Sequence, residues 1–186
     1  MLNPIIVLYT YFPEKFALRI LLLITLAALS SAILNILLRK GKICRRTTLI
    51  SLTLVVYILL LFFYIVLGRR SHDYYNLSLD FIEPYKCLIQ NGTFWDYREF
   101  IVNIVSFIPI GFLTGCITKH LKIIKGTAVG FLFSLLCEIL QFVMRNGYSE
   151  VKDVINNTFG AFIGALLCVI VLSIIKKKGG KLSVQN

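Results

Sequence analysis

Long apolar runs alternate with short polar segments along the whole chain. A helix needs about 20 apolar residues to cross the roughly 30 Å hydrocarbon core of a bilayer. Five runs reach this length, at residues 16–38, 47–67, 100–118, 123–144 and 154–175. The pattern therefore predicts an all-α, polytopic membrane protein with five transmembrane helices.

The polar segments between these runs differ in length. Residues 68–99 form the longest, and within them residues 79–89 (LDFIEPYKCLI) are amphipathic, which is typical of a helix lying along the membrane surface. Residues 145–153 are expected to form a short turn. A signal peptide is the alternative for residues 16–38, but this run is too long and no basic residue precedes Lys15.

The predicted spans divide the chain into three segments. Residues 1–46 are expected to hold an interfacial lead-in, the first transmembrane helix and a basic cytoplasmic loop. Residues 47–175 are expected to form a membrane domain with four transmembrane helices. Residues 176–186 are expected to be a basic cytoplasmic tail.

The positive charge is distributed in a way that predicts the orientation. A net charge of +11 could indicate nucleic-acid binding. However, five basic residues lie in 39–46, three in 119–125 and four in the C-terminal tail, and these segments contain no acid. Because Lys and Arg are enriched in cytoplasmic loops, this distribution favours the N-terminus outside, the C-terminus inside and no nucleic-acid partner.

Composition agrees with a membrane protein and argues against metal or redox chemistry. The chain is 58% apolar and 16% charged, whereas soluble domains are closer to half apolar and a quarter charged. Its five cysteines form no C-x-x-C pair and no cluster with histidine. We therefore expect neither a cofactor nor a metal.

Polar side chains interrupt the last three apolar runs. Ser134, Glu138, Gln141 and Arg145 are spaced by four, three and four residues, so on a helix they share one face. In the predicted topology, polar side chains of the last three helices lie at one depth in the outer half of the membrane. Ionisable side chains inside a membrane are costly and usually mark a functional site. The candidate ligand-binding residues of this polar pocket are Asn103, Glu138, Gln141, Arg145, Asp153, Asn156 and Asn157.

Small residues in the same runs predict close helix packing. Each run contains one G-x-x-x-G pattern, which lets helix backbones approach in lipid. A proline in the third run is expected to bend its helix. The candidate helix-packing residues are Pro109, Gly111, Gly115, Gly126, Gly130, Gly160 and Gly164.

Structural roles remain open for the polar residues. Glu138 and Arg145 could form an ion pair, or Arg145 could reach the lipid head groups. Asp153 could interact with a helix dipole, and the carboxamides could join helices by hydrogen bonds. Both histidines, His72 and His120, lie outside the predicted spans, so catalysis is permitted but not indicated, and no catalytic residue is assigned.

These residues resemble the VanZ-like family of bacterial membrane proteins over roughly residues 75–172. The matching pieces are EFIVNIVSFIPIGFLTG, SLLCEILQFV with its E-x-x-Q, Arg145 and DVINNTFGAFIG. LDFIEPYK resembles the segment before these spans. Where close relatives often carry a second acid beside the turn aspartate, Val151 and Lys152 precede a lone Asp153.

The resemblance implies a multi-pass protein of the bacterial cell membrane, in a family whose namesake is associated with resistance to teicoplanin. It implies no catalytic role. The family positions are Asn103, Pro109, Gly111, Glu138, Gln141, Arg145, Asp153, Asn157 and Gly160.

Three functions are compatible with these observations. The first is binding or handling of an amphiphile of the cell envelope, such as a lipid-linked precursor or a lipoglycopeptide, in an outer-leaflet pocket. The second is an intramembrane enzyme that modifies an envelope lipid. The third is a structural partner of a membrane complex. The lipid bilayer is the common partner of all three.

Overall fold

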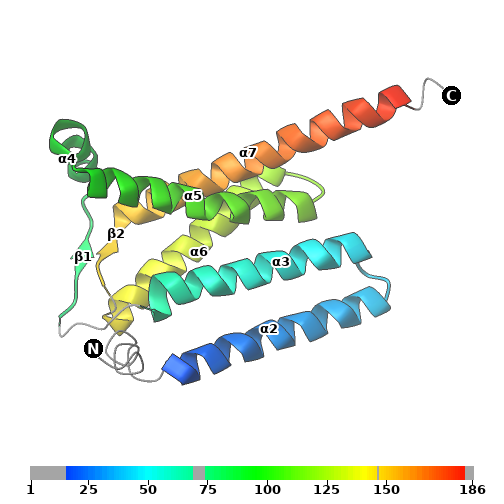
Figure 1. The fold of residues 1–186 in the computed structure, drawn as a ribbon, viewed down its shortest axis with the longest axis horizontal. Coiled ribbons are helices and arrows are strands. Elements are labelled where there is room, and N and C mark those ends of the chain that lie inside the picture. Colours follow the sequence, from blue (N-terminus) through cyan, green and yellow to red (C-terminus); the bar gives the residue numbers. More distant parts are fainter. Residues whose placement is uncertain (1–15, 69–73, 146, 183–186) are drawn as a thin grey trace, which may run out of the picture. The chain divides into compact units, whose positions relative to one another are not determined.

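The computed structural model describes residues 16–68, 74–145 and 147–182, and the predicted lead-in at residues 1–15 lies outside them. Within the described residues six α-helices follow one another (Figure 1). They are α2 (Phe16–Arg39), α3 (Arg45–Phe62), α4 (Glu83–Asn91), α5 (Phe94–Ile117), α6 (Lys122–Met144) and α7 (Val151–Leu182). A π-helix, η1 (Phe63–Leu67), continues α3, and two short strands are β1 (Leu77–Ser78) and β2 (Ser149–Glu150).

Five of these helices are long and apolar enough to cross a membrane. The candidate spans are Leu18–Arg39, Arg45–Leu67, Tyr97–Ile117, Lys122–Met144 and Val151–Lys177. The predicted number of spans is therefore confirmed, and each observed span overlaps its predicted range. The amphipathic segment forms α4, a nine-residue helix with Pro84 in its first turn.

The chain divides into two compact units, and each is described by itself. Unit 1 comprises residues 1–79 and 135–151, and unit 2 comprises residues 80–134 and 152–186. Helix α6 contributes its first half to unit 2 and its second half to unit 1.

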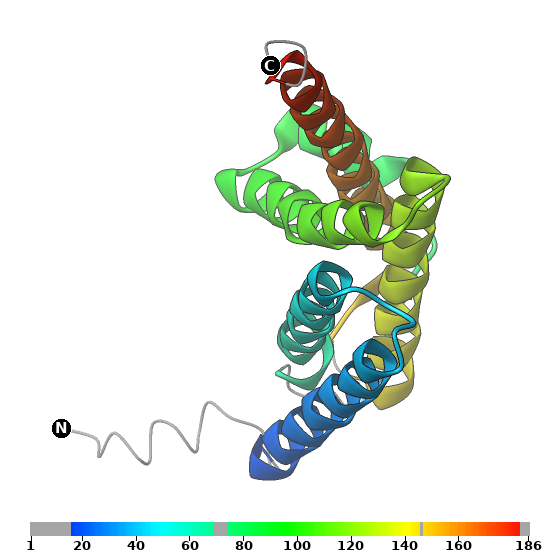
Figure 2. The same ribbon diagram turned by 90° about the vertical axis from the view of Figure 1, so that its right-hand side faces the viewer.

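In unit 1, α2 and α3 lie side by side as a helical hairpin (Figures 1 and 2). The end of α3 widens into the π-helix η1. The change in backbone hydrogen-bonding pattern leaves some carbonyl oxygens without their usual N–H partner, so they accept hydrogen bonds from other groups. Gln141 of α6 donates its Nε2 hydrogen to the carbonyl of Ile65 at 2.9 Å, and Arg19 of α2 donates to the carbonyl of Leu67. Two polar side chains inside apolar runs thus satisfy the backbone of η1.

The predicted turn at residues 145–153 is more structured than expected. Its residues Ser149 and Glu150 form β2, which pairs in parallel with β1 in the order Leu77–Ser149 and Ser78–Glu150. Helix α6 ends at Met144, just before this segment.

Arg145 differs from the predicted position on the face of α6. Its φ is 55°, and the chain turns again at Gly147, where φ is 109°. The left-handed conformation at Arg145 ends the helix, because continuing α6 requires a negative φ.

In unit 2, α5 and α7 touch through their backbones. A β-carbon added to Gly111 of α5 would lie 1.8 Å from the carbonyl oxygen of Ala161 of α7. One added to Gly164 of α7 would lie 1.9 Å from the carbonyl oxygen of Ile108 of α5. These glycines lie where the two helices come close together, because small residues let helix backbones approach in lipid.

The first half of α6 packs against the same pair of helices. A β-carbon on Gly130 would lie 2.2 Å from the β-carbon of Ala161, and one on Gly126 would lie 2.7 Å from that of Ala165. Phe107 of α5 is fully buried beside this contact. Unit 2 is thus a tight three-helix core, to which α4 is attached at one end.

Candidate functional site

The seven candidate pocket residues fall into the two units. Glu138, Gln141 and Arg145 belong to unit 1. The carboxamides and the carboxylate of α5 and α7, namely Asn103, Asp153, Asn156 and Asn157, belong to unit 2. A single pocket formed by all seven stays a prediction.

A pocket of about 260 Å³ lies among α4, α5 and α7, entirely within unit 2. Its lining mixes carboxamides, two carboxylates, one ammonium group and several apolar side chains. The lining residues are Pro84, Tyr85, Cys87, Leu88, Asn91, Glu99, Phe100, Asn103, Lys152, Asp153 and Asn156. We call this the unit 2 pocket, and it contains three of the candidate residues.

Asn103 and Asp153 join α5 to α7 at the wall of this pocket. Asn103 donates its Nδ2 hydrogen to Oδ1 of Asp153 at 2.8 Å, and Asp153 is 8% exposed. Asp153 lies in the first turn of α7, where the helix dipole favours a negative charge. Asp153 thus combines the position near the helix N-terminus that was its structural alternative with a specific hydrogen bond to α5.

Tyr85 attaches α4 to the same wall. Its hydroxyl donates to Oδ1 of Asn156 at 2.8 Å, and its ring meets the ring of Phe100 edge-on, with centroids 6.2 Å apart. Burial raises the pKa of Tyr85, and the negative charge of Asp153 adds to this effect, while Lys152 lowers it. Tyr85 therefore stays protonated at neutral pH and keeps its role as a donor.

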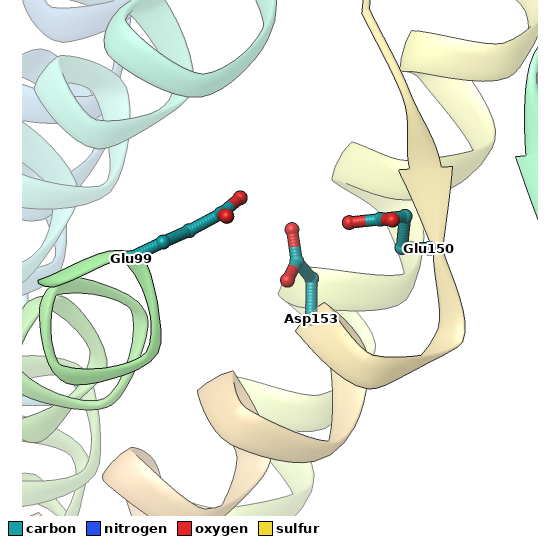
Figure 3. A group of neighbouring side chains, drawn as sticks. All are labelled: Glu99, Glu150 and Asp153. Carbon is teal, nitrogen blue, oxygen red and sulfur yellow. The ribbon is translucent and has the colours of Figure 1, made fainter. Parts of the chain in front are cut away.

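Two carboxylates face the pocket from different helices. Figure 3 shows Glu99 of α5 and Asp153 of α7 pointing toward one another, and one oxygen of each lies within 4.8 Å of the other. Glu150, also drawn there, belongs to unit 1. Lys152 Nζ lies 3.9 Å from Oε2 of Glu99. Oxygen ligands of this kind suit a hard cation or the donors of a head group, and they suit zinc poorly.

Sequence reasoning did not single out Tyr85, Glu99 and Lys152. Glu99 precedes Asn103 by one helical turn, so the helical spacing could have placed both on one face of α5. Lys152 is adjacent to Asp153. Tyr85 gave no comparable signal, because its position depends on how α4 docks.

Asn157 has a different role from its neighbour Asn156. Its Nδ2 group donates to the hydroxyl of Ser134 of α6 at 2.9 Å, and both side chains are buried. Asn157 Oδ1 has no hydrogen-bond partner among the described residues. This contact is the interhelical hydrogen bond that was the structural alternative for the carboxamides, and Asn157 does not line the unit 2 pocket.

Glu138 and Arg145 of unit 1 have separate partners. Oε2 of Glu138 accepts a hydrogen bond from the backbone N–H of Glu150 at 2.9 Å, so this buried carboxylate supports β2. Arg145 Nη2 donates to the hydroxyl of Tyr75 at 2.9 Å, and its guanidinium lies 4.2 Å from the centre of that ring. These contacts tie Glu138 to β2 and Arg145 to the segment that leads into β1.

Comparison with known proteins points to one family. The family model described as VanZ/LLP1 matches residues 48–172. Protein VanZ of Enterococcus faecium is 35% identical over 128 residues, which cover 68% of this chain and 74% of that protein. No solved structure matches. The matched region contains the unit 2 pocket and all seven candidate residues, whereas all of α2 and the loop between α2 and α3 precede it.

Proposed function

Because this chain belongs to the VanZ/LLP1 family, we propose that it is a membrane protein that binds an envelope-related amphiphile through the unit 2 pocket. The observation that carries this proposal is the hydrogen-bonded Asn103–Asp153 pair, with Asp153 buried and Asn103 half-buried, at the wall of a pocket that also has apolar lining. Polar groups placed in a partly apolar cavity are the usual composition of a ligand site.

The size and charge of the pocket favour a particular kind of head group. A volume of about 260 Å³ is below the range of sites for drug-sized ligands, so it fits part of an amphiphile rather than the whole molecule. Glu99 and Asp153 supply two negative charges, and Lys152 supplies one positive charge. This balance favours the hydroxyl or amine groups of a head group, such as those of a sugar or a peptide, as the part that enters the pocket, and it disfavours a multiply charged phosphate there.

The tail of such a ligand would remain in the lipid phase. Helices α5 and α7, which form the pocket, also carry exposed apolar side chains, including Ile101, Val105, Ile155 and Phe159. A tail along these helices would stay in an apolar environment while the head group enters the pocket. A lipid-linked envelope precursor and a lipoglycopeptide such as teicoplanin both have this form, and binding either could contribute to resistance.

Binding can be measured directly on the purified chain in detergent. Teicoplanin and a lipid-linked peptidoglycan precursor are titrated separately by isothermal calorimetry. We expect saturable binding of at least one of them, reduced about tenfold or more by Asn103→Leu, which removes the half-buried amide that donates to the Asp153 carboxylate. Absence of saturable binding of both probes would contradict the proposal.

The facing carboxylates favour an enzyme as the second candidate. Glu99 and Asp153 could act as acid and base on a lipid held between them. An enzyme would convert a lipid-linked precursor into a product of different mass, and Glu99→Gln would lower the rate of this conversion far more than it weakens binding. A binding protein would return the precursor unchanged.

We further propose the N-terminus outside and the C-terminus inside, on the basis of the basic segments. Labelling of single-cysteine variants with an impermeant thiol reagent tests this topology, because Cys44 and Cys87 are both exposed. Intact cells should label Cys87 but not Cys44. The Thr47 hydroxyl lowers the pKa of Cys44 through a hydrogen bond, so Cys44 should label readily once the cells are permeabilised. The reverse pattern in intact cells would overturn the orientation.

A further inference from the structure

The α2–α3 hairpin concentrates positive charge at its loop. Helix α2 ends at Arg39 and α3 begins at Arg45, and the chain turns between them at Gly41, where φ is 67°. Residues 39–46 contain five basic residues and no acid. This segment precedes the part of the chain that matches the family, and the proposed function does not use it.

An apolar groove begins next to this loop. It lies between the last turns of α2 and the first turns of α3, within unit 1, and has a volume of about 160 Å³. Leu34, Leu38 and Leu52 form apolar walls, and Arg45 lines the same groove. The buried hydroxyl of Thr48 in the groove already donates to the carbonyl of Cys44, so it needs no other acceptor.

This combination fits one class of occupant. An acyl chain suits the leucine walls, because it can pack against them while it stays in an apolar environment. A phosphate suits Arg45, since a guanidinium binds phosphate through two parallel hydrogen bonds. Arg45 is also the first residue of α3, where the helix dipole is positive.

The charge around the groove distinguishes anionic from zwitterionic lipids. Basic residues beside a membrane helix attract anionic lipids through the negative surface potential of the membrane. The loop contains no carboxylate to pair with the amine of a zwitterionic head group. We propose that the α2–α3 hairpin holds an anionic glycerophospholipid, with its phosphate at Arg45 and an acyl chain in the groove.

Lipid binding to the full chain in a neutral detergent tests this site. Phosphatidylglycerol and phosphatidylcholine with identical acyl chains are titrated at fixed salt and followed by native mass spectrometry. Phosphatidylglycerol should bind about tenfold more tightly or better, and Arg45→Gln should remove about tenfold of its affinity. Arg46→Gln is the matched control, because it removes the same charge from an exposed residue that does not line the groove, and its effect should be smaller.

The groove is tested separately from the charge. Ser31 also lines the groove, and Ser31→Phe should weaken phosphatidylglycerol binding at unchanged net charge because the ring occupies the space of the acyl chain. Ser31→Phe also tests lipid binding in the groove if the Arg45→Gln variant does not fold. Equal affinity for the two lipids, equal effects of Arg45→Gln and Arg46→Gln, or full displacement of the lipid by millimolar inorganic phosphate would overturn the proposal.

Discussion

Replacing Gly111 with alanine should clearly lower the yield of folded, detergent-stable protein and its Tm. The added β-carbon would lie 1.8 Å from the carbonyl oxygen of Ala161 and 2.7 Å from its carbonyl carbon. Both atoms belong to the backbone of α7, so no side-chain rotation relieves the overlap. Helices α5 and α7 would have to separate along their contact.

The expected cost follows from this geometry. Inserting a methylene into a packed core usually costs about 1–3 kcal/mol, and a clash with backbone lies at the upper end of this range or above it. Folded proteins are stable by only about 5–15 kcal/mol. We therefore expect Gly111→Ala to cost about 3 kcal/mol or more, and to lower both the yield of monodisperse protein and its Tm.

Gly115→Ala is the matched control in the same helix and the same G-x-x-x-G pattern. Its β-carbon would lie 3.0 Å from the β-carbon and sulfur of Cys168, which are side-chain atoms. A shift of a few tenths of an ångström accommodates this contact, so the loss of stability should be clearly smaller. Equal yields and equal Tm values for the two variants would contradict the backbone contact between α5 and α7.

A double variant tests whether the clash acts through one interface. Gly164→Ala introduces a β-carbon 1.9 Å from the carbonyl oxygen of Ile108, on the other side of the same contact. If Gly111→Ala already separates the helices, adding Gly164→Ala should lower the free energy of unfolding by less than Gly164→Ala does alone. The free energies of unfolding should then be less than additive, as for other residues that share a contact.

The helices could be predicted from sequence, because the length of an apolar run alone determines whether it can cross a bilayer. Each predicted span overlaps an observed one, and the amphipathic segment forms α4. The G-x-x-x-G patterns marked positions at which the helices of unit 2 meet, although the spacing did not say which helix faces which. Gly111 opposes Ala161, and Gly130 opposes the same alanine from α6.

The site was less predictable, because its geometry depends on contacts between distant residues. Periodicity placed Arg145 on a helical face, but its positive φ turns the chain out of α6. The pairing of β1 with β2 joins segments about 70 residues apart, and its register gives the carboxylate of Glu138 a backbone partner in Glu150. No pattern in either segment indicates such a pairing.

The replacement of Asp153 by asparagine should separate function from folding. Asparagine has nearly the same shape, and its Oδ1 can still accept the hydrogen bond from Asn103. The variant loses the charge in the first turn of α7 and the charge-assisted character of the bond, which together cost about 1–2 kcal/mol. Membrane levels should therefore stay close to those of the unmodified chain.

Ligand binding should respond more strongly than folding. The carboxylate of Asp153 is one of the two negative charges of the unit 2 pocket, and a buried charged hydrogen bond to a ligand is worth tenfold or more in affinity, on the order of 1.5–3 kcal/mol. Affinity for the amphiphile should fall by about this factor, and any resistance to teicoplanin should fall with it. Glu83→Gln is the control, because it makes the same chemical change on α4 at an exposed side chain outside the pocket.

Tyr85 reports whether the pocket of the Asp153→Asn variant is still assembled. Burial is the main cause that raises the pKa of Tyr85, and the charge of Asp153 raises this pKa further. Removing the charge should lower this pKa, but burial should keep it above the ordinary value of tyrosine. The change can be followed by ultraviolet difference titration at alkaline pH, with Tyr85→Phe as the reference.

Exchanging the two residues distinguishes a ligand contact from a structural pair. In the Asn103→Asp, Asp153→Asn double variant the pocket keeps its net charge, and a carboxamide and a carboxylate still face one another across α5 and α7. If the pair only joins the helices, the exchange should restore both stability and binding. If the ligand needs a carboxylate at position 153, stability should recover while affinity stays low. We expect the second result, because Glu99 already points toward Asp153 from α5, and a carboxylate moved to position 103 would leave the α7 side of the pocket without one.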